Sequence, residues 1–145
     1  MSKLIQVING PNLNKLGERP AEHYGSMTLD QIIQSMKVKA ESLGVEIAAF
    51  QANAKGAIVD AIQNACKSSA GIIINAGAYS HTSIAIRDAL ECASVPIIEV
   101  HLSNIYSREA YRQHSFVSEV ADGIISGLGG KGYLLALDAI VELVA

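Results

Sequence analysis

Several side chains of this sequence can transfer protons, and two of them stand close to a charged residue. The candidates are His101, His81, Tyr24 and Tyr79, with Arg19 and Arg112 as cations. Residues two apart on a strand share one face, so Glu99 can orient His101 and compensate a positive charge on its ring. Arg19 shares an irregular segment with Tyr24, and its guanidinium would favour the phenolate. The pattern is typical of acid–base catalysis, although Glu99 would be an exposed residue if its strand lay at an edge.

Polar side chains also follow four short apolar runs, where parallel strands would end. They are Asn9, Asn12, Asn14, Gln51, Asn53, Asn75, Tyr79, His81, His101, Ser103 and Asn104. In an open parallel sheet, ligands bind beyond the carboxyl ends of the strands. Turn chemistry alone would explain any one of these residues. Four polar strand ends together indicate a site for an organic ligand.

No cofactor motif accompanies these residues. The sequence lacks GxGxxG after the first apolar run and lacks GxxxxGK[ST], the signatures of dinucleotide and P-loop phosphate sites. His81 and His101 are candidate metal ligands, but no third ligand is spaced to join them. We therefore expect no cofactor and no metal.

The elements that must position these residues alternate in type. Short runs rich in Ile and Val alternate with segments of helical periodicity, which is typical of βαβ units and a parallel sheet. The predicted strands are 4–8, 45–50, 71–74, 96–100 and 123–126, and the predicted helices are 29–43, 56–69, 82–93 and 131–144. Thr28 and Gln31 fit a capping box at the first helix, and Gly44 is placed to end it. Because crossovers are right-handed, the most economical fold is α/β: a flavodoxin-like, doubly wound, five-stranded parallel sheet with helices on both faces.

Composition limits the domain count, the partners and the location. The chain has 145 residues, half of them hydrophobic, so we expect a single catalytic domain over 1–145. A formal charge of −3 argues against nucleic acid as a partner. No apolar run is long enough to cross a membrane and no signal peptide is apparent, so we expect a cytoplasmic protein with Cys66 and Cys92 as buried, reduced thiols. Only 17% of residues are charged, which suggests that part of the surface is covered in an oligomer.

Several separated motifs, in order along the chain, resemble the type II 3-dehydroquinases. They are Asn9-Gly-Pro-Asn-Leu-Asn14, Gly17-Glu-Arg19 through Tyr24-Gly25, Asn75-Ala-Gly-Ala-Tyr-Ser-His-Thr-Ser83, Arg87-Asp88-Ala-Leu90, Glu99-Val-His-Leu-Ser-Asn104, Arg108-Glu109 and Arg112-Gln-His-Ser115. The resemblance spans nearly the whole chain. It implies the flavodoxin-like fold and self-association as a homododecamer, a tetramer of trimers, which would also account for the low charge.

The resemblance further implies a reaction: cofactor-free dehydration of 3-dehydroquinate to 3-dehydroshikimate by anti elimination through an enolate. This step belongs to the shikimate pathway of aromatic amino acid biosynthesis and also to quinate breakdown. By the match, Tyr24 is the base, acting as phenolate, Arg19 assists it, and Asn12 holds a water against the enolate oxygen. His101 matches the general acid that protonates the departing hydroxyl, with Glu99 behind it.

The same match assigns the contacts with the substrate. Asn75 and the backbone at Leu102 and Ser103 match the groups that bind the substrate carboxylate in this family. His81 and Arg112 match partners of the ring hydroxyls.

A further match is Asp88, an acid that in this family reaches the substrate from a neighbouring subunit. Some positions depart from the family pattern: Pro20 directly follows Arg19, and Ala76 stands where proline is common. None of these departures removes a proposed catalytic group.

Two alternatives remain open. A relative with the same fold could bind another small polyhydroxylated acid, which the joint presence of Tyr24, Arg19 and His101 disfavours. A non-catalytic flavodoxin-like module is the second alternative, and in it the polar strand ends are turn chemistry only.

Overall fold

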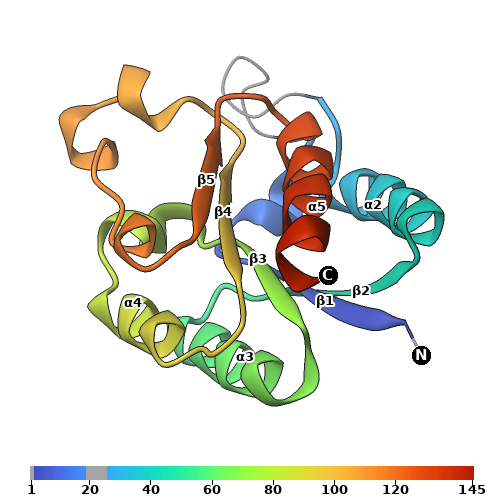
Figure 1. Cartoon of the computed structure of the whole chain (residues 1–145). Helices are drawn as coiled ribbons and strands as arrows, with labels where there is room; N and C mark the ends of the chain where they lie inside the picture. The colour runs from blue at the N-terminus through green and yellow to red at the C-terminus, as the bar shows by residue number, and fades with distance from the viewer. Residues whose placement is uncertain (1, 19–25) are drawn as a thin grey trace.

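Five parallel strands form the centre of the molecule, in the order β2-β1-β3-β4-β5 (Figure 1). The computed structural model describes residues 2–18 and 26–145. The strands are β1 (Lys3–Asn9), β2 (Val45–Gln51), β3 (Gly71–Asn75), β4 (Ile97–His101) and β5 (Gly123–Ser126). Each lies within one residue of its predicted bounds. All four pairings are parallel, and this strand order is the flavodoxin-like, doubly wound one, which confirms the predicted fold.

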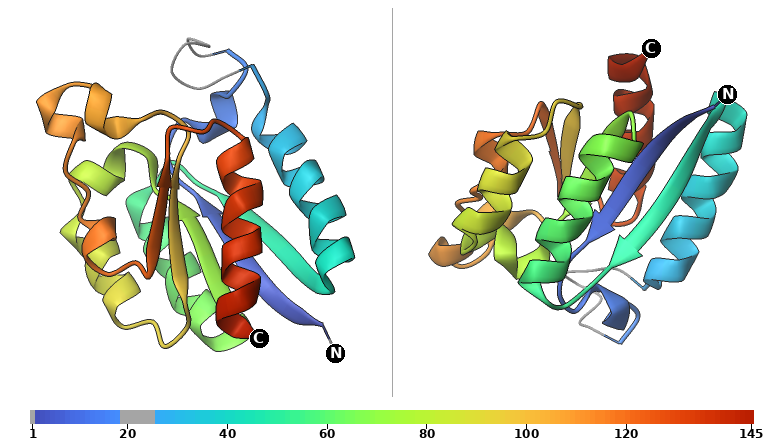
Figure 2. Two further views of the ribbon diagram at one scale, coloured as in Figure 1. Left: turned by 45° about the horizontal axis from the view of Figure 1, so that its top comes forward. Right: turned by 90° about the horizontal axis from the view of Figure 1, so that it is seen from below.

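Helices cover both faces of the sheet, as predicted (Figure 2). They are α2 (Leu29–Leu43), α3 (Lys55–Ser68), α4 (Ile84–Glu91) and α5 (Lys131–Val144). The pair α2 and α5 packs on one face, and the pair α3 and α4 packs on the other. No helix in the described part of the chain is long and apolar enough to span a membrane.

The ends of α2 follow from its sequence. The Thr28 hydroxyl accepts a hydrogen bond from the Gln31 backbone N–H at 3.1 Å, and the Gln31 side chain accepts one from the Thr28 backbone N–H at 2.9 Å. This reciprocal pair is the predicted capping box. Gly44 ends the helix with φ of 73°, a left-handed conformation that favours glycine.

The start of α4 differs from the prediction. Residues Gly77–His81 form a separate 3₁₀ helix, η2, so α4 begins after Thr82 rather than at it. The Ser83 hydroxyl accepts from the Ile86 N–H at 3.0 Å and caps the helix there. Cys92 lies at the other end of α4 and is exposed, so its predicted burial is wrong, and Cys66 in α3 is half-buried.

Strand alternation divides the core into two clusters, one on each face. Ile5 and Val7 of β1 pack toward α2 and α5, whereas Ile8 packs toward α3 and α4. The strands β3 and β4 are buried along their whole length. Any polar side chain on these two strands must therefore find a partner inside the protein.

Candidate active site

A pocket lies at the carboxyl ends of β1, β3 and β4, as expected for an open parallel sheet. Its walls are formed by Pro11, Asn12, Leu13, Asn75, Gly77, Ala78, His81, His101, Leu102, Ser103, Ile105, Arg108 and Arg112. Seven of the residues singled out from the sequence are in this set: Asn12, Asn75, His81, His101, Leu102, Ser103 and Arg112. The sheet thus gathers side chains that are far apart in the chain.

Close backbone packing between Gly10 and Ala76 fixes the segments that carry Asn12 and Asn75. A Cβ atom at Gly10 would lie 2.4 Å from the Ala76 carbonyl oxygen, so only glycine fits there. Asn12 has φ of 68° and is the one non-glycine residue with positive φ in the described ranges. Its backbone N–H donates to the Asn53 side-chain oxygen at 3.0 Å. Asparagine tolerates this left-handed conformation better than most residues, so the strained turn holds Asn12 at the pocket wall.

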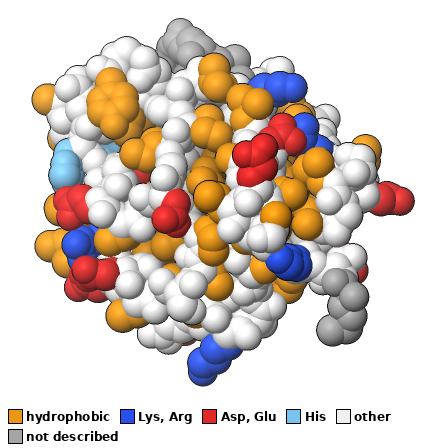
Figure 3. All heavy atoms as spheres, viewed as in Figure 1, with side chains coloured by type: hydrophobic (Ala, Val, Ile, Leu, Met, Phe, Trp, Pro, Cys, Tyr) orange, Lys and Arg blue, Asp and Glu red, His pale blue; other side chains and the backbone are white. Residues whose placement is uncertain are grey.

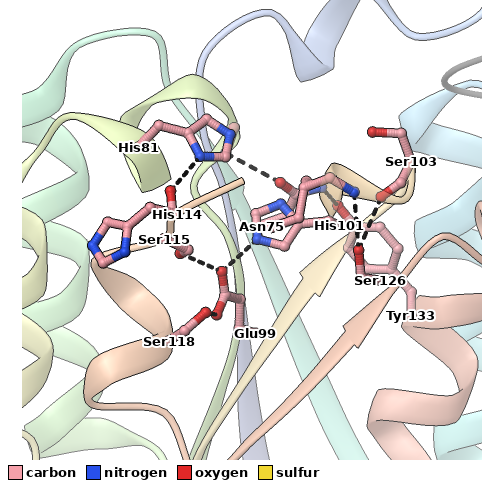
Figure 4. A network of polar contacts seen from close by, with 12 residues as sticks. Asn75, His81, Glu99, His101, Ser103, His114, Ser115, Ser118, Ser126 and Tyr133 are labelled. Atoms are coloured by element: carbon pink, nitrogen blue, oxygen red, sulfur yellow. Dashed lines mark hydrogen bonds and ion pairs between the residues drawn. The ribbon is translucent and has the colours of Figure 1, made fainter. Parts of the chain in front are cut away.

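Glu99 and His101 share one face of β4 and contact each other directly (Figure 4). Glu99 is fully buried, which excludes the alternative of an exposed edge residue. His101 donates from Nε2 to Glu99 Oε2, which leaves Nδ1 as the ring nitrogen that can serve a ligand. The hydroxyls of Ser115 and Ser118 also donate to the carboxylate, the former at 2.6 Å.

These contacts determine the charge of Glu99. Burial alone would raise the pKa of the carboxyl, but the hydrogen bond and charge of His101 and the hydroxyls of Ser115 and Ser118 outweigh burial and lower that pKa. Glu99 is therefore ionised at neutral pH. A buried carboxylate can compensate a positive charge on the imidazole, which is the arrangement required of a general acid.

His81 faces the same pocket, with its ring stacked 6.1 Å from that of His101. Its Nδ1 lies 2.8 Å from the His114 carbonyl oxygen, which can only accept, so Nδ1 carries the proton. Burial lowers the pKa of His81 despite this hydrogen bond, and the ring is neutral at neutral pH. The remaining nitrogen, Nε2, is then an acceptor suited to a hydroxyl group.

Two arginines line the rim of the pocket. Arg112 donates to Glu109 at 3.1 Å, and Arg108 reaches the Ser103 hydroxyl at 3.4 Å. Hydrogen bonds from Tyr111 and Arg112 help to lower the pKa of Glu109 to about 2, so this carboxylate stays ionised and anchors Arg112. The two guanidinium groups make the rim attractive to an anion.

Asn75 lies on the pocket floor and joins a buried polar chain. Its Nδ2 donates to the Tyr133 hydroxyl at 3.0 Å, and that hydroxyl donates to Asn9 Oδ1 at 2.6 Å. The strand register pairs Asn9 with Asn75, which places both amides beside α5. Asn75 Oδ1 accepts from the Gly77 N–H at 3.1 Å.

Sequence reasoning assigned no role to several residues that the structure places in or behind the site. These are Arg108, Ser115, Ser118 and Tyr133. Arg108 and Ser115 lie in motifs that resemble the family, so the sequence did offer a reason to assign them to the site. Tyr133 lies in the segment 132–137, which the family resemblance also covers. Ser118 carries no local signal, because its partner Glu99 lies on a strand distant in the sequence.

One predicted site residue of the described chain lies away from this pocket. Asp88 is exposed on α4, is ion-paired with Arg87 at 3.0 Å and does not line this pocket. Arg19 and Tyr24 lie outside the described residues. Within 2–18 and 26–145, no group of three or more potential metal ligands gathers.

Comparisons with known proteins agree with this architecture. A family model described as Dehydroquinase class II matches residues 3–141. The 3-dehydroquinate dehydratase of Trichodesmium erythraeum (strain IMS101) is 55% identical over 138 residues, which cover 95% of this chain and 92% of the relative. The catabolic 3-dehydroquinase of Aspergillus clavatus is 54% identical, with the same coverage. The crystal structure of type II dehydroquinase from Propionibacterium acnes matches with a TM-score of 0.94 at 42% identity over 98% of both chains. The chain therefore belongs to the class II dehydroquinase family.

Proposed function

We propose that this enzyme dehydrates 3-dehydroquinate to 3-dehydroshikimate. The names of its relatives support the substrate. The observation that carries the proposal is the buried Glu99–His101 pair at the edge of a pocket that also holds Asn12 and Asn75. The geometry offers an acid, an amide beside it and two arginines for an anionic substrate.

The first half of the reaction removes a proton next to a ketone. Such a proton is weakly acidic, so the step needs a strong base and a group that stabilises the enolate oxygen. We assign the base to Tyr24 as phenolate and its activation to Arg19. Asn12 would hold a water against the enolate, and its place on the pocket wall supports that role.

The second half expels hydroxide, which is a poor leaving group unless it is protonated. We assign this proton to Nδ1 of His101, because Nε2 is occupied by Glu99. The enolate re-forms the ketone, and the electrons of its C=C bond form the new C=C bond of the enone. The C–O bond breaks with its electrons on the oxygen, and the proton from His101 completes a water molecule. Glu99 compensates the positive charge of the ring before transfer.

The remaining pocket residues would bind the substrate. Asn75 and the backbone at Leu102 and Ser103 would hold the carboxylate. His81 would accept a hydrogen bond from a ring hydroxyl through Nε2, which is consistent with its neutral state. Arg112, anchored by its carboxylate partner, would contact a second hydroxyl.

We also propose that the chain assembles as a homododecamer, a tetramer of trimers, in the cytoplasm. Large apolar side chains are exposed, and Figure 3 shows apolar groups spread over the face that carries β5 and α5. The most exposed of them include Tyr111 at 68%, Val38 at 64% and Ile84 at 57%. Asp88, exposed on α4, would enter a neighbour's pocket. Light scattering of the purified protein tests this assembly, and a monomer would contradict it.

The reaction is tested by mixing purified protein with 3-dehydroquinate and following the conjugated enone of the product in the near ultraviolet. Tyr24→Phe should lose on the order of 10² or more in kcat, the scale of acid–base assistance. Tyr106→Phe, at an exposed position, is the matched control and should keep wild-type turnover.

Each alternative function has its own outcome in this assay. A folded, oligomeric protein without enone formation would overturn the proposed reaction. Binding of a different polyhydroxylated acid in that case would favour a relative with another substrate. The absence of binding to any such acid would favour a non-catalytic module.

The metabolic role is a separate question. Relatives carry both the general and the catabolic name, and both roles use the same chemistry. We place this enzyme in the shikimate pathway, a proposal that genetic deletion tests through a requirement for aromatic amino acids.

A further inference from the structure

Asn75 is held from behind by a residue that does not reach the pocket. Tyr133 lies on α5 and is fully buried, and its side chain lies beside that of Asn75 (Figure 4). Its hydroxyl contacts the side chains of Asn9 and Asn75 where β1 and β3 pair. Tyr133 is one of the few aromatic residues of the chain, and it packs among aliphatic side chains. A phenol in such surroundings needs partners for its hydroxyl, and two amides supply them.

The orientation of this chain is set at both ends by backbone groups. The Gly77 N–H can only donate, so the Asn75 atom that faces it must be the oxygen, Oδ1. Nδ2 of Asn75 then faces the Tyr133 hydroxyl, which accepts and must send its own proton to Asn9 Oδ1. At the far end, Nδ2 of Asn9 faces the Phe50 carbonyl oxygen at 3.5 Å, which can only accept. The hydrogen bonds that link Asn75, Tyr133 and Asn9 can therefore form with only one choice of donors and acceptors.

The hydroxyl keeps its single proton under all relevant conditions. Burial raises the pKa of Tyr133 well above its usual range. Because that proton is committed to Asn9, the oxygen of Tyr133 is left as an acceptor toward Asn75. One N–H of the Asn75 amide is used in this contact, and the second remains for a ligand in the pocket that Asn75 lines.

We propose that Tyr133 is a positioning residue that acts together with the Gly77 N–H to fix the Asn75 amide, so that the amide presents an N–H, and never its oxygen, to the substrate carboxylate. The inference rests on the proposed function. An amide turned by 180° would set its Oδ1 against a carboxylate oxygen, and two acceptors facing each other repel. Tyr133 thereby acts on substrate binding through Asn75, without contact with the reacting atoms.

The test is a double-mutant cycle read as KM and kcat. Tyr133→Phe removes one oxygen and keeps the ring, so the packing of α5 is preserved. We expect KM to rise about tenfold in Tyr133→Phe, the scale of a hydrogen bond to a charged group, with kcat changed by less than threefold. Asn75→Ala should raise KM at least as much. In the double variant, KM should equal that of Asn75→Ala within twofold, because Tyr133 has nothing left to orient.

Several controls separate the outcomes. Tyr106→Phe also removes one phenol oxygen, from an exposed side chain, and should leave KM unchanged. If Tyr133→Phe does not fold, Asn9→Ala is the second variant: it frees the Tyr133 proton to turn toward Asn75 and should raise KM in the same direction. A merely structural role of Tyr133 would change KM by the same factor with and without Asn75, and that additivity would overturn the inference. Loss of all turnover in the wild type would instead overturn the proposed function.

Discussion

Replacing Glu99 by Gln removes a negative charge and little else. The two side chains have nearly the same shape, and Gln keeps one oxygen acceptor for His101. The Ser118 hydroxyl can rotate to accept from the new amide, so the hydrogen bonds behind the pocket can be re-formed. Glu99 does not line the pocket, so direct contacts with substrate are unchanged.

The expected magnitude follows from the contact between Glu99 and His101. Two unit charges about 4 Å apart interact by about 4 kcal/mol at an effective dielectric constant of about 20. The amide dipole of Gln recovers part of that energy. Each 1.36 kcal/mol corresponds to about a tenfold change in rate. If His101 must carry a positive charge before it protonates the leaving hydroxyl, Glu99→Gln should lower kcat by about 10² to 10³.

The assay is steady-state formation of the enone product, with KM and kcat determined separately. KM should stay within about threefold of the wild type. Glu46→Gln removes an exposed charge from β2, far from the pocket, and is the matched control. Thermal unfolding checks the fold of the variant, because loss of the carboxylate hydrogen bonds destabilises the protein whereas removal of a buried charge stabilises it. A kcat within fivefold of the wild type in a folded Glu99→Gln variant would refute the assigned role of the pair.

Three further outcomes concern stability. Thr28→Ala should lower the free energy of unfolding by about 1 kcal/mol in urea titration, because the capping box is lost; an unchanged midpoint would contradict this. Gly10→Ala forces a Cβ against the Ala76 carbonyl oxygen and should cost about 1–3 kcal/mol or more, and a wild-type melting temperature would show that the loops can separate freely. The lowered pKa of Glu99 contributes stability that is present above the usual glutamate pKa of about 4.3 and is lost as pH falls through the lower folded value. Wild-type stability relative to Glu99→Gln should therefore fall as the pH drops below the usual glutamate pKa, as thermal scans at several pH values would show.

The sheet could be predicted from the sequence because its signals are local. Runs such as 71–74 are continuous in Ile and too short for a helix, which indicates a buried parallel strand. The capping box at Thr28 and Gln31 depends on residues three apart and needs no tertiary information. The contact of Glu99 with His101 followed from the two-residue period of a strand.

Other features depend on contacts that no local pattern reveals. Both Thr82 and Ser83 could cap a helix by residue type. Because the 3₁₀ helix η2 extends to His81, α4 begins later and Ser83 is its N-cap. Tyr133 fits the apolar stripe of α5, so its periodicity predicts packing and says nothing of two amides on distant strands. Asp88 is exposed on α4 and does not line the pocket, so the role proposed for it depends on a contact between subunits that no pattern within one chain reveals.

The parallel pairing of β1 also bears on how the chain folds. Lys3 pairs with Val45 and Ile5 with Gly71, and neighbouring parallel strands cannot be joined by a tight hairpin. Long loops must therefore close before the centre of the sheet gains any stability, which slows folding. During synthesis, β1 leaves the ribosome before β2 and β3, so Ile5 and Ile8 stay unpaired until both partner strands have been made. The strand that later carries Asn9 to its buried contact with Tyr133 is thus a segment that a chaperone would protect during synthesis.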